Sequence, residues 1–87
     1  GTLEMPTSII TEADLRDGNI DIIGLLVASG LVPTRSEGRR AVEQGGVSVN
    51  DEKITDIKKL YAPNDLGGDG IVLRRGKKNY KRVKFQN

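Results

Sequence analysis

The residues best suited to chemistry in this sequence are arginines on a short predicted helix. Arg35 and Arg39 are four residues apart, so their side chains are neighbours on one helix face, and Arg40 extends the same side. We expect no acidic side chain between the first two on that face. Like charges placed in this way repel each other unless a polyanion neutralises them. The pattern therefore predicts a helix face that binds phosphates.

Local signals define the element that would position these arginines. Thr34 and Glu37 have the spacing of a capping box, in which each side chain bonds the backbone N–H of the other, so the helix should begin just after Thr34. Gly45 and Gly46 permit the left-handed turn that ends a helix. The segment 47–49 then alternates valine with serine, which is typical of a short strand.

A second basic group lies in a predicted closing hairpin. Residues 71–75 and 79–85 read as strands on either side of a turn at 76–78. From residue 74 onward the only charged side chains are basic: Arg74, Arg75, Lys77, Lys78, Lys81, Arg82 and Lys84. Period-two alternation places two sets on opposite faces: Lys81, Val83 and Phe85 on one, and Tyr80, Arg82 and Lys84 on the other. The cations suit phosphates, and Tyr80 either stacks on an unpaired base or simply packs on the sheet.

Composition bounds the class of protein. The 87 residues are 36% apolar with one Phe, two Tyr and no Trp, which predicts one small domain with an aliphatic core. The absence of Cys and His excludes disulfides, thiolate and imidazole chemistry and the usual zinc ligands. We therefore expect no catalytic residue and no metal ligand in this chain. A cytoplasmic location fits the absence of Cys and His best. The sequence also has no apolar run of the roughly 20 residues that a membrane span needs.

The remaining elements complete an expected α+β fold. A helix capped by Asn19 or Asp21 should run through 22–29 to Gly30, and because it is apolar nearly all round it should be buried. Gly38 on the second helix would permit a close approach between the two helices. A small hairpin should follow, with its turn at Asn50-Asp51, and residues 57–70 should be mostly loop. The prediction is two packed helices followed by short antiparallel β-hairpins in a small sheet.

The chain is expected to divide into two parts. Residues 1–18 show no clear period and read as an N-terminal arm, partly disordered or forming a short edge strand near 7–11. Residues 19–87 form the domain proper. The arm is acidic and the rest is basic, so although the net charge is only +2 a partner would meet a strongly positive surface.

These residues resemble a known family. The runs Ser36-Glu37-Gly38-Arg39-Arg40, Gly45-Gly46-Val47 and Val49-Asn50 resemble the S4-like RNA-binding motif. With 22–31 and the closing hairpin through Phe85, the chain is similar to the C-terminal domain of bacterial tyrosyl-tRNA synthetases. The resemblance implies that this domain binds RNA, and not DNA, at the long variable arm of tyrosine tRNA and the stem beside it. Aminoacylation with ATP and Mg²⁺ would occur in a separate catalytic domain of a cytoplasmic homodimer, and the S4-like domain itself would hold no cofactor.

The resemblance also implies the contact residues. Carried over by position, they are Thr34, Arg35, Arg39, Arg40 and Gln44 on the second helix, Asn50 and Lys53 near the first hairpin, and Arg74, Arg75, Lys77, Lys78, Tyr80, Lys81 and Arg82 in the closing hairpin. Two residues depart from the family pattern. Asp51 stands where many relatives have Gly, which disfavours the tight turn and weakens Asn50 as a phosphate contact. Gly38 stands where Ala is usual and lowers the helix propensity.

Two alternatives stay open. S4-like motifs also occur in pseudouridine synthases and in small ribosome-associated proteins, whose target is ribosomal RNA. From a different class, the chain could be a protein-interaction module whose basic face pairs with an acidic partner, and its own acidic arm could cover that face. Under either RNA reading, recognition should depend on backbone and shape, because double-helical RNA hides its base edges in a deep, narrow groove.

Overall fold

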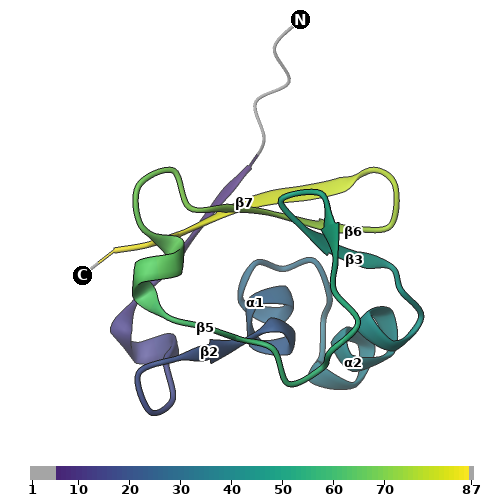
Figure 1. The fold of residues 1–87 in the computed structure, drawn as a ribbon, viewed down its shortest axis with the longest axis horizontal. Coiled ribbons are helices and arrows are strands. Elements are labelled where there is room, and N and C mark those ends of the chain that lie inside the picture. Colours follow the sequence, from purple (N-terminus) through teal and green to yellow (C-terminus); the bar gives the residue numbers. More distant parts are fainter. Residues whose placement is uncertain (1–5, 87) are drawn as a thin grey trace, which may run out of the picture.

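The computed structural model describes residues 6–86, which form two layers (Figure 1). One layer is a five-stranded sheet in the order β1-β7-β6-β3-β4, and helices α1 (Ile22–Ala28) and α2 (Arg35–Glu43) both lie on one side of it. The strands of this sheet are β1 (Thr7–Ile10), β3 (Val47–Val49), β4 (Glu52–Lys53), β6 (Ile71–Arg75) and β7 (Asn79–Phe85). The expected α+β fold is confirmed.

The first strand joins the edge of this sheet. β1 runs parallel to β7, with Thr7 opposite Arg82 and Ile10 opposite Phe85, and Ile10 is fully buried. A short 3-10 turn at Glu12–Asp14 follows it. Residues 1–5 of the expected arm and Asn87 lie outside the described residues. The division of the chain at residue 18 stays a prediction.

A second, two-stranded sheet was not expected. β2 (Ile20–Asp21) pairs antiparallel with β5 (Leu60–Tyr61), and a 3-10 turn at Pro63–Leu66 follows. Apart from these two short elements, 57–70 is loop, as predicted. The Tyr61 ring packs into the core, where burial and the nearby Asp65 and Glu52 carboxylates raise the pKa of its hydroxyl to about 12.

Both helices begin where their caps predict. The Asp21 carboxylate accepts a hydrogen bond from the Gly24 N–H at 3.0 Å, so Asp21, not Asn19, caps α1. The Thr34 hydroxyl accepts one from the Glu37 N–H at 3.2 Å. The other half of the expected capping box is wrong, because the Glu37 carboxylate lies 3.9 Å from the Arg75 guanidinium instead. Neither helix is long or apolar enough to cross a membrane, nor is any other in the described part of the chain.

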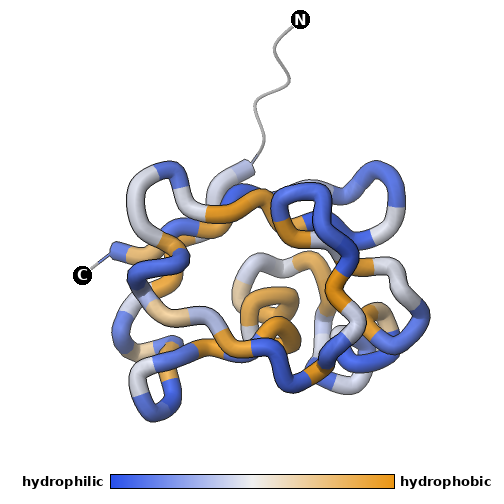
Figure 2. Tube along the Cα trace, in the orientation of Figure 1, coloured by the Kyte–Doolittle hydropathy of each residue, from blue (hydrophilic) through white to orange (hydrophobic). Residues whose placement is uncertain are grey.

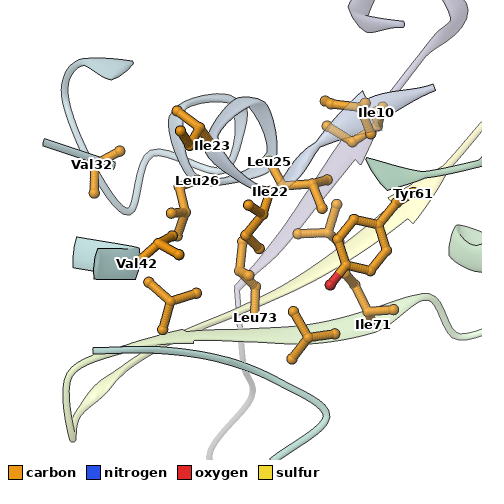
Figure 3. Packing of buried hydrophobic residues seen from close by; sticks show 14 of the residues in the cluster. Ile10, Ile22, Ile23, Leu25, Leu26, Val32, Val42, Tyr61, Ile71 and Leu73 are labelled. Atoms are coloured by element: carbon orange, nitrogen blue, oxygen red, sulfur yellow. The ribbon is translucent and has the colours of Figure 1, made fainter. Parts of the chain in front are cut away.

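The core lies between the helices and the sheet. The apolar segments of α1 face the inner side of the strands, while the turns and loop tips are hydrophilic (Figure 2). Ile22, Leu25 and Leu26 of α1 pack in one buried cluster with Leu73 and Val83 of the sheet (Figure 3). Among the described residues the buried members of this cluster are aliphatic apart from Tyr61, as the composition predicted, and the partly buried Phe85 packs against them.

Gly38 lies where the two helices cross. A Cβ atom at this position would sit 3.2 Å from Ile23 Cγ2 and 3.3 Å from Val32 Cγ2, which is tighter than ordinary van der Waals contact. The prediction of a close helix approach at Gly38 is confirmed. The missing side chain fixes how deeply α2 sits against α1, and therefore where its arginines point.

The turn between β3 and β4 forms despite Asp51. Asn50 and Asp51 both have positive φ values, 51° and 68°, as a two-residue turn of type I′ requires. The unfavourable residue therefore leaves the turn geometry intact. Its effect should be a cost in free energy of folding, because Asp occupies the left-handed region less readily than Gly.

Candidate nucleic-acid interface

The closing hairpin divides the predicted contact residues between two faces. Val47 lies opposite Arg75, which lies opposite Asn79, and because Val47 is buried against the helices this row faces them. The neighbouring row of Ser48, Arg74 and Tyr80 must then point the other way, since successive side chains alternate across a strand. The basic hairpin is therefore not a single surface.

On the helix side, the hairpin and α2 enclose a hollow of about 210 Å³. Its lining comes from α2 and two residues that follow its end, and from the β6–β7 turn with the strand ends beside it: Glu37, Arg40, Ala41, Gln44, Gly46, Arg75, Gly76 and Asn79. Arg40, Gln44 and Arg75 were predicted contacts, and the structure brings them together here. Asn79 was missed, although its place two residues before Lys81 could have put it on this face.

One backbone contact holds the hollow together. The Gly76 N–H donates to the Gly46 carbonyl at 2.7 Å and ties the β6–β7 turn to the end of α2. Gly46 is itself tied back to the helix, because its N–H donates to the Ala41 carbonyl. Gly45 and Gly76 both have φ of +73°, a region that favours glycine. The glycines therefore place Arg75 beside Arg40.

The hollow is positively charged, and its arginines form few ion pairs and hydrogen bonds within the protein. Among the described residues Arg40 forms no ion pair. Arg75 approaches Glu37 only at 3.9 Å, beyond hydrogen-bond distance, and its Nε is buried without a hydrogen-bond partner. The exposed Lys77 and Lys78 lie in the adjoining turn. An anion with several acceptor oxygens, such as a phosphate, matches the Arg40 guanidinium and the exposed ammonium groups of Lys77 and Lys78.

The other end of α2 is different. Arg35 binds the Asp21 carboxylate, with Nη2 2.6 Å from Oδ2, and Arg39 lies 3.5 Å from Glu43 one turn along the helix. Arg35 and Arg39 therefore each have an acidic partner, which relieves the like-charge repulsion predicted for them. The first partner is distant in sequence, but the second is an i, i+4 pair that the sequence already shows.

The Asp21 carboxylate has two roles. It caps α1 through Gly24 and it neutralises Arg35 at the start of α2. Its partial burial raises its pKa, but the hydrogen bonds from Arg35 and the Gly24 N–H outweigh that effect and hold the pKa below its usual value. Asp21 is therefore ionised at neutral pH and holds the two helices together at this end.

A larger hollow, of about 580 Å³, opens beside Arg35. Its charged lining is mostly acidic, with Asp14, Asp17 and Asp21 against Arg16 and Arg35, over an apolar floor that includes Leu15 and Val27. Such a rim repels phosphates. Size alone therefore does not mark the nucleic-acid site, and the smaller basic hollow is the better candidate.

Three further predicted contact residues make interactions within the protein. The Asn50 side-chain carbonyl accepts a hydrogen bond from the Val72 N–H at 2.9 Å, and Thr34 caps α2. Lys53 lies across the end of α2, since a Cβ at Gly45 would meet Lys53 Cε at 2.6 Å. A cation there is favourable beside the C-terminal carbonyls of a helix.

The face turned away from the helices carries Arg74, Tyr80 and Arg82 of the predicted set, whereas Lys81 lies on the other side. Arg74 donates to the Ser48 hydroxyl at 3.1 Å and lies 6.0 Å from the centre of the Tyr80 ring. Arg82 donates to the Asp69 carbonyl at 2.8 Å. Lys81 lies in the row of buried Leu73, on the helix side, as alternation predicted. Its Nζ lies near Gly30, away from Tyr80 and Arg82.

Known proteins are similar to this chain in sequence and in fold. The family described as tyrosine–tRNA ligase SYY-like C-terminal domain matches residues 3–83. A tyrosine–tRNA ligase of Acetivibrio thermocellus is 41% identical over 84 residues, covering 97% of this chain and 20% of that protein. One from Clostridium botulinum, strain Loch Maree, is 44% identical over 79 residues, covering 91% and 19%.

A solved structure agrees. The solution structure of a tyrosyl-tRNA synthetase C-terminal domain superimposes with a TM-score of 0.71 at 29% identity, covering 94% of this chain and 79% of that one. The chain spans about a fifth of the length of the curated relatives it matches.

Proposed function

The chain belongs to the family of SYY-like C-terminal domains of tyrosine–tRNA ligases, and from that membership we propose that it binds tyrosine tRNA on behalf of such a ligase. The observation that carries the proposal is the basic hollow between α2 and the β6–β7 turn. It gathers Arg40 and Gln44 of α2 with Arg75 of the distant strand β6. Among the described residues Arg40 has no ion pair, and Arg75 meets Glu37 only at 3.9 Å.

The proposed contacts are with backbone and shape. Arg40 and Arg75 bind phosphate oxygens, with Lys77 and Lys78 extending the positive surface along the turn. The amides of Gln44 and Asn79 can both donate and accept, so they suit 2′-hydroxyl groups, which distinguish RNA from DNA. A stem beside the long variable arm presents both groups across its shallow minor groove. Architecture, more than base sequence, then selects the tRNA.

The wider setting follows the relatives' printed activity. We propose that tyrosine activation with ATP and Mg²⁺ takes place in a separate catalytic domain of a cytoplasmic homodimer, and that this domain contributes no cofactor. Its own affinity for RNA should be modest and should fall with salt, since released counterions drive such binding. Tethering to a catalytic domain that holds the same tRNA raises the effective concentration of the second contact.

Amide chemical shifts test the proposal directly. The ¹⁵N-labelled chain is titrated with a tyrosine tRNA and, as a control, with a tRNA that has a short variable arm, each at 50 and 200 mM salt. We expect shifts at Arg40, Gln44 and 75–79, a preference for the tyrosine tRNA, and weaker binding at high salt. Equal binding of both tRNAs would refute the variable-arm contact. The absence of shifts with either RNA would refute the function.

A further inference from the structure

The face of the five-stranded sheet opposite the helices is open among the described residues (Figure 1). On strands β1, β3, β6 and β7 the pairing register places three rows on it: Ser48, Arg74 and Tyr80; Val72, Arg82 and Thr7; and Lys84 with Ile9. We call these residues the outer face. None of them is acidic, and three are cations.

The outer face also exposes apolar area. Tyr80 is 37% exposed and Ile9 is 46% exposed, and on the described part of the chain Leu60 is the one other large hydrophobic residue that is exposed. Tyr80 and Ile9 lie on neighbouring strands, with Arg82 next to Tyr80 on the same side of β7. A surface that combines exposed rings and aliphatic groups with cations, and without carboxylates, suits a partner that is both flat and anionic.

The cations here are held in place by the protein. Arg74 is fixed by the Ser48 hydroxyl, and its guanidinium lies 6.0 Å from the centre of the Tyr80 ring. Its Nε is buried with no hydrogen-bond partner. Arg82 is fixed by the Asp69 carbonyl through one of its nitrogens, which leaves its other donors available. Ordering these side chains beforehand lowers the entropy cost of binding.

We propose that the outer face binds unpaired RNA nucleotides, with one base stacked on the Tyr80 ring and the adjoining phosphates bound by Arg74 and Arg82. The inference rests on the proposed tRNA-binding function and deepens it, because it assigns a different part of the RNA to each side of the hairpin. The hollow would hold a double-helical stem, and the outer face a single-stranded loop or junction. Sheets with exposed aromatic side chains commonly bind unpaired bases in this way.

A partner protein with an acidic surface fits less well. Carboxylates would pair with Arg74 and Arg82, but they would gain nothing from the exposed Tyr80 ring between them. A nucleobase stacks on that ring while its own phosphates meet the cations. The arrangement of ring and cations therefore favours a nucleotide chain over an acidic peptide.

Two RNA probes separate the two faces. One probe is octauridylate, a single-stranded RNA. The other is an RNA hairpin with a blunt-ended stem closed by a loop. Each is labelled for fluorescence anisotropy and measured at 50 mM salt. We expect Tyr80→Ser to weaken octauridylate binding by about 5-fold to 100-fold, the range for losing one stacked base. Tyr80→Phe keeps the ring and should bind nearly as the parent chain does. Arg40→Gln, on the other face, should weaken only the stem.

Tyrosine fluorescence supplies a second readout. Tyr61 is buried and Tyr80 is exposed, and the chain has no Trp. Octauridylate should therefore quench the emission of the parent chain, and the quenching should vanish in Tyr80→Phe although that variant still binds. A structural role of the ring alone would not produce this combination. Unchanged melting temperatures establish that the variants fold.

The possible results distinguish binding of unpaired RNA at the outer face from the proposed tRNA-binding function. If Tyr80→Ser binds octauridylate as tightly as Tyr80→Phe does, stacking on Tyr80 is refuted. If the parent chain binds the stem but not octauridylate, or binds polyglutamate more tightly than octauridylate, the outer face does not serve unpaired RNA while the proposed function stands. If neither RNA binds, both proposals fail.

Discussion

An arginine lies towards each end of α2, and the two differ in whether an acidic side chain neutralises them. At the N-terminal end Arg35 is bound to Asp21 at 2.6 Å, beside a hollow with an acidic rim. At the C-terminal end Arg40 has no ion pair among the described residues and lines a hollow with Arg75. The first arginine joins two helices, and the second is available to a ligand.

From this difference we expect that neutralisation by the fold, more than residue type, decides which cations remain available to RNA. The same distinction holds elsewhere in the predicted contact set. Asn50 is committed to the Val72 N–H and Thr34 to the Glu37 N–H, whereas Gln44 makes no side-chain hydrogen bond within residues 6–86. We therefore expect substitutions at the two ends of α2 to affect different measurements.

The largest effect on stability should come from substituting Gly38, because the close helix crossing at this residue positions both ends of α2. Gly38→Leu would push its side chain into Ile23 and Val32, so α2 must move away from α1. Overpacking of this kind should lower the free energy of unfolding by about 2 to 3 kcal/mol. Urea denaturation followed by circular dichroism measures it.

A smaller step at the same position gives the control. In Gly38→Ala the added methyl needs neighbours to shift by only a few tenths of an ångström, and it gains up to about 1 kcal/mol of helix propensity. We expect its stability to stay close to that of the parent chain. If Gly38→Leu were equally stable, the close crossing would not be what positions the two ends of α2.

The second largest effect should distinguish the two ends of α2 by their contribution to RNA affinity. Arg40→Gln combined with Arg75→Gln should weaken tyrosine tRNA binding by about 10-fold to 30-fold at low salt, because two phosphate contacts are lost. The slope of log Kd against log salt should fall by about 2. Stability should change little, since Arg40 has no ion pair and the Glu37–Arg75 contact is long.

The matched control removes the same charge elsewhere. Arg16→Gln combined with Lys58→Gln lies outside the basic hollow, since neither residue lines it. This variant should keep most of the affinity and most of the salt dependence. Equal losses in the two double variants would mean that net charge, and not the hollow, governs binding.

Local signals in the sequence predicted most of the elements and only part of the site. The caps at Asp21 and Thr34 and the turn at Gly76 act over a few residues, so the two helices and the β6–β7 hairpin were correctly predicted. The β2–β5 pair was missed because it joins two-residue strands that are about 40 residues apart in sequence, with no periodicity to show it.

The sequence predicted only in part which charged side chains share a face and which are paired with an opposite charge. Alternation placed Lys81 and Tyr80 on opposite faces, and the Arg39–Glu43 pair follows from helix spacing. The Arg35–Asp21 pair and the hollow around Arg40 depend on how α2 packs on α1 and the sheet. Such packing brings distant segments together, and it is set by buried volume at residues such as Gly38.

A smaller effect should test the N-terminal end. Arg35→Gln removes the partner of Asp21 and should lower the free energy of unfolding by about 0.5 kcal/mol, the usual size for an exposed ion pair. RNA affinity should change less than in the Arg40 and Arg75 variant. If Arg35→Gln instead weakened tRNA binding by 10-fold without a loss of stability, the contrast between the two ends would be wrong.

The stability difference at Arg35 should depend on pH. The pKa of Asp21 is lowered in the folded chain, so its contribution is complete above the unfolded value of about 4 and is lost as the pH falls through the lower folded value. The parent chain and Arg35→Gln should therefore differ at pH 7 and converge towards pH 2. Urea midpoints at pH 7, 4 and 2.5 measure this, and a difference that grew on acidification would contradict the Asp21 pairing.

The smallest effect should come from a turn that belongs to neither end. Asp51 has φ of 68° next to Asn50, and Asp51→Gly relieves that left-handed conformation, so the free energy of unfolding should rise by less than about 0.5 kcal/mol. Because the Asn50 side chain is committed to Val72, the substitution should leave the salt slope of tRNA binding unchanged. A steeper slope would mean that Asn50 or Lys53 contacts phosphate once the carboxylate is gone, and that the binding surface extends beyond the hollow to the β3–β4 turn.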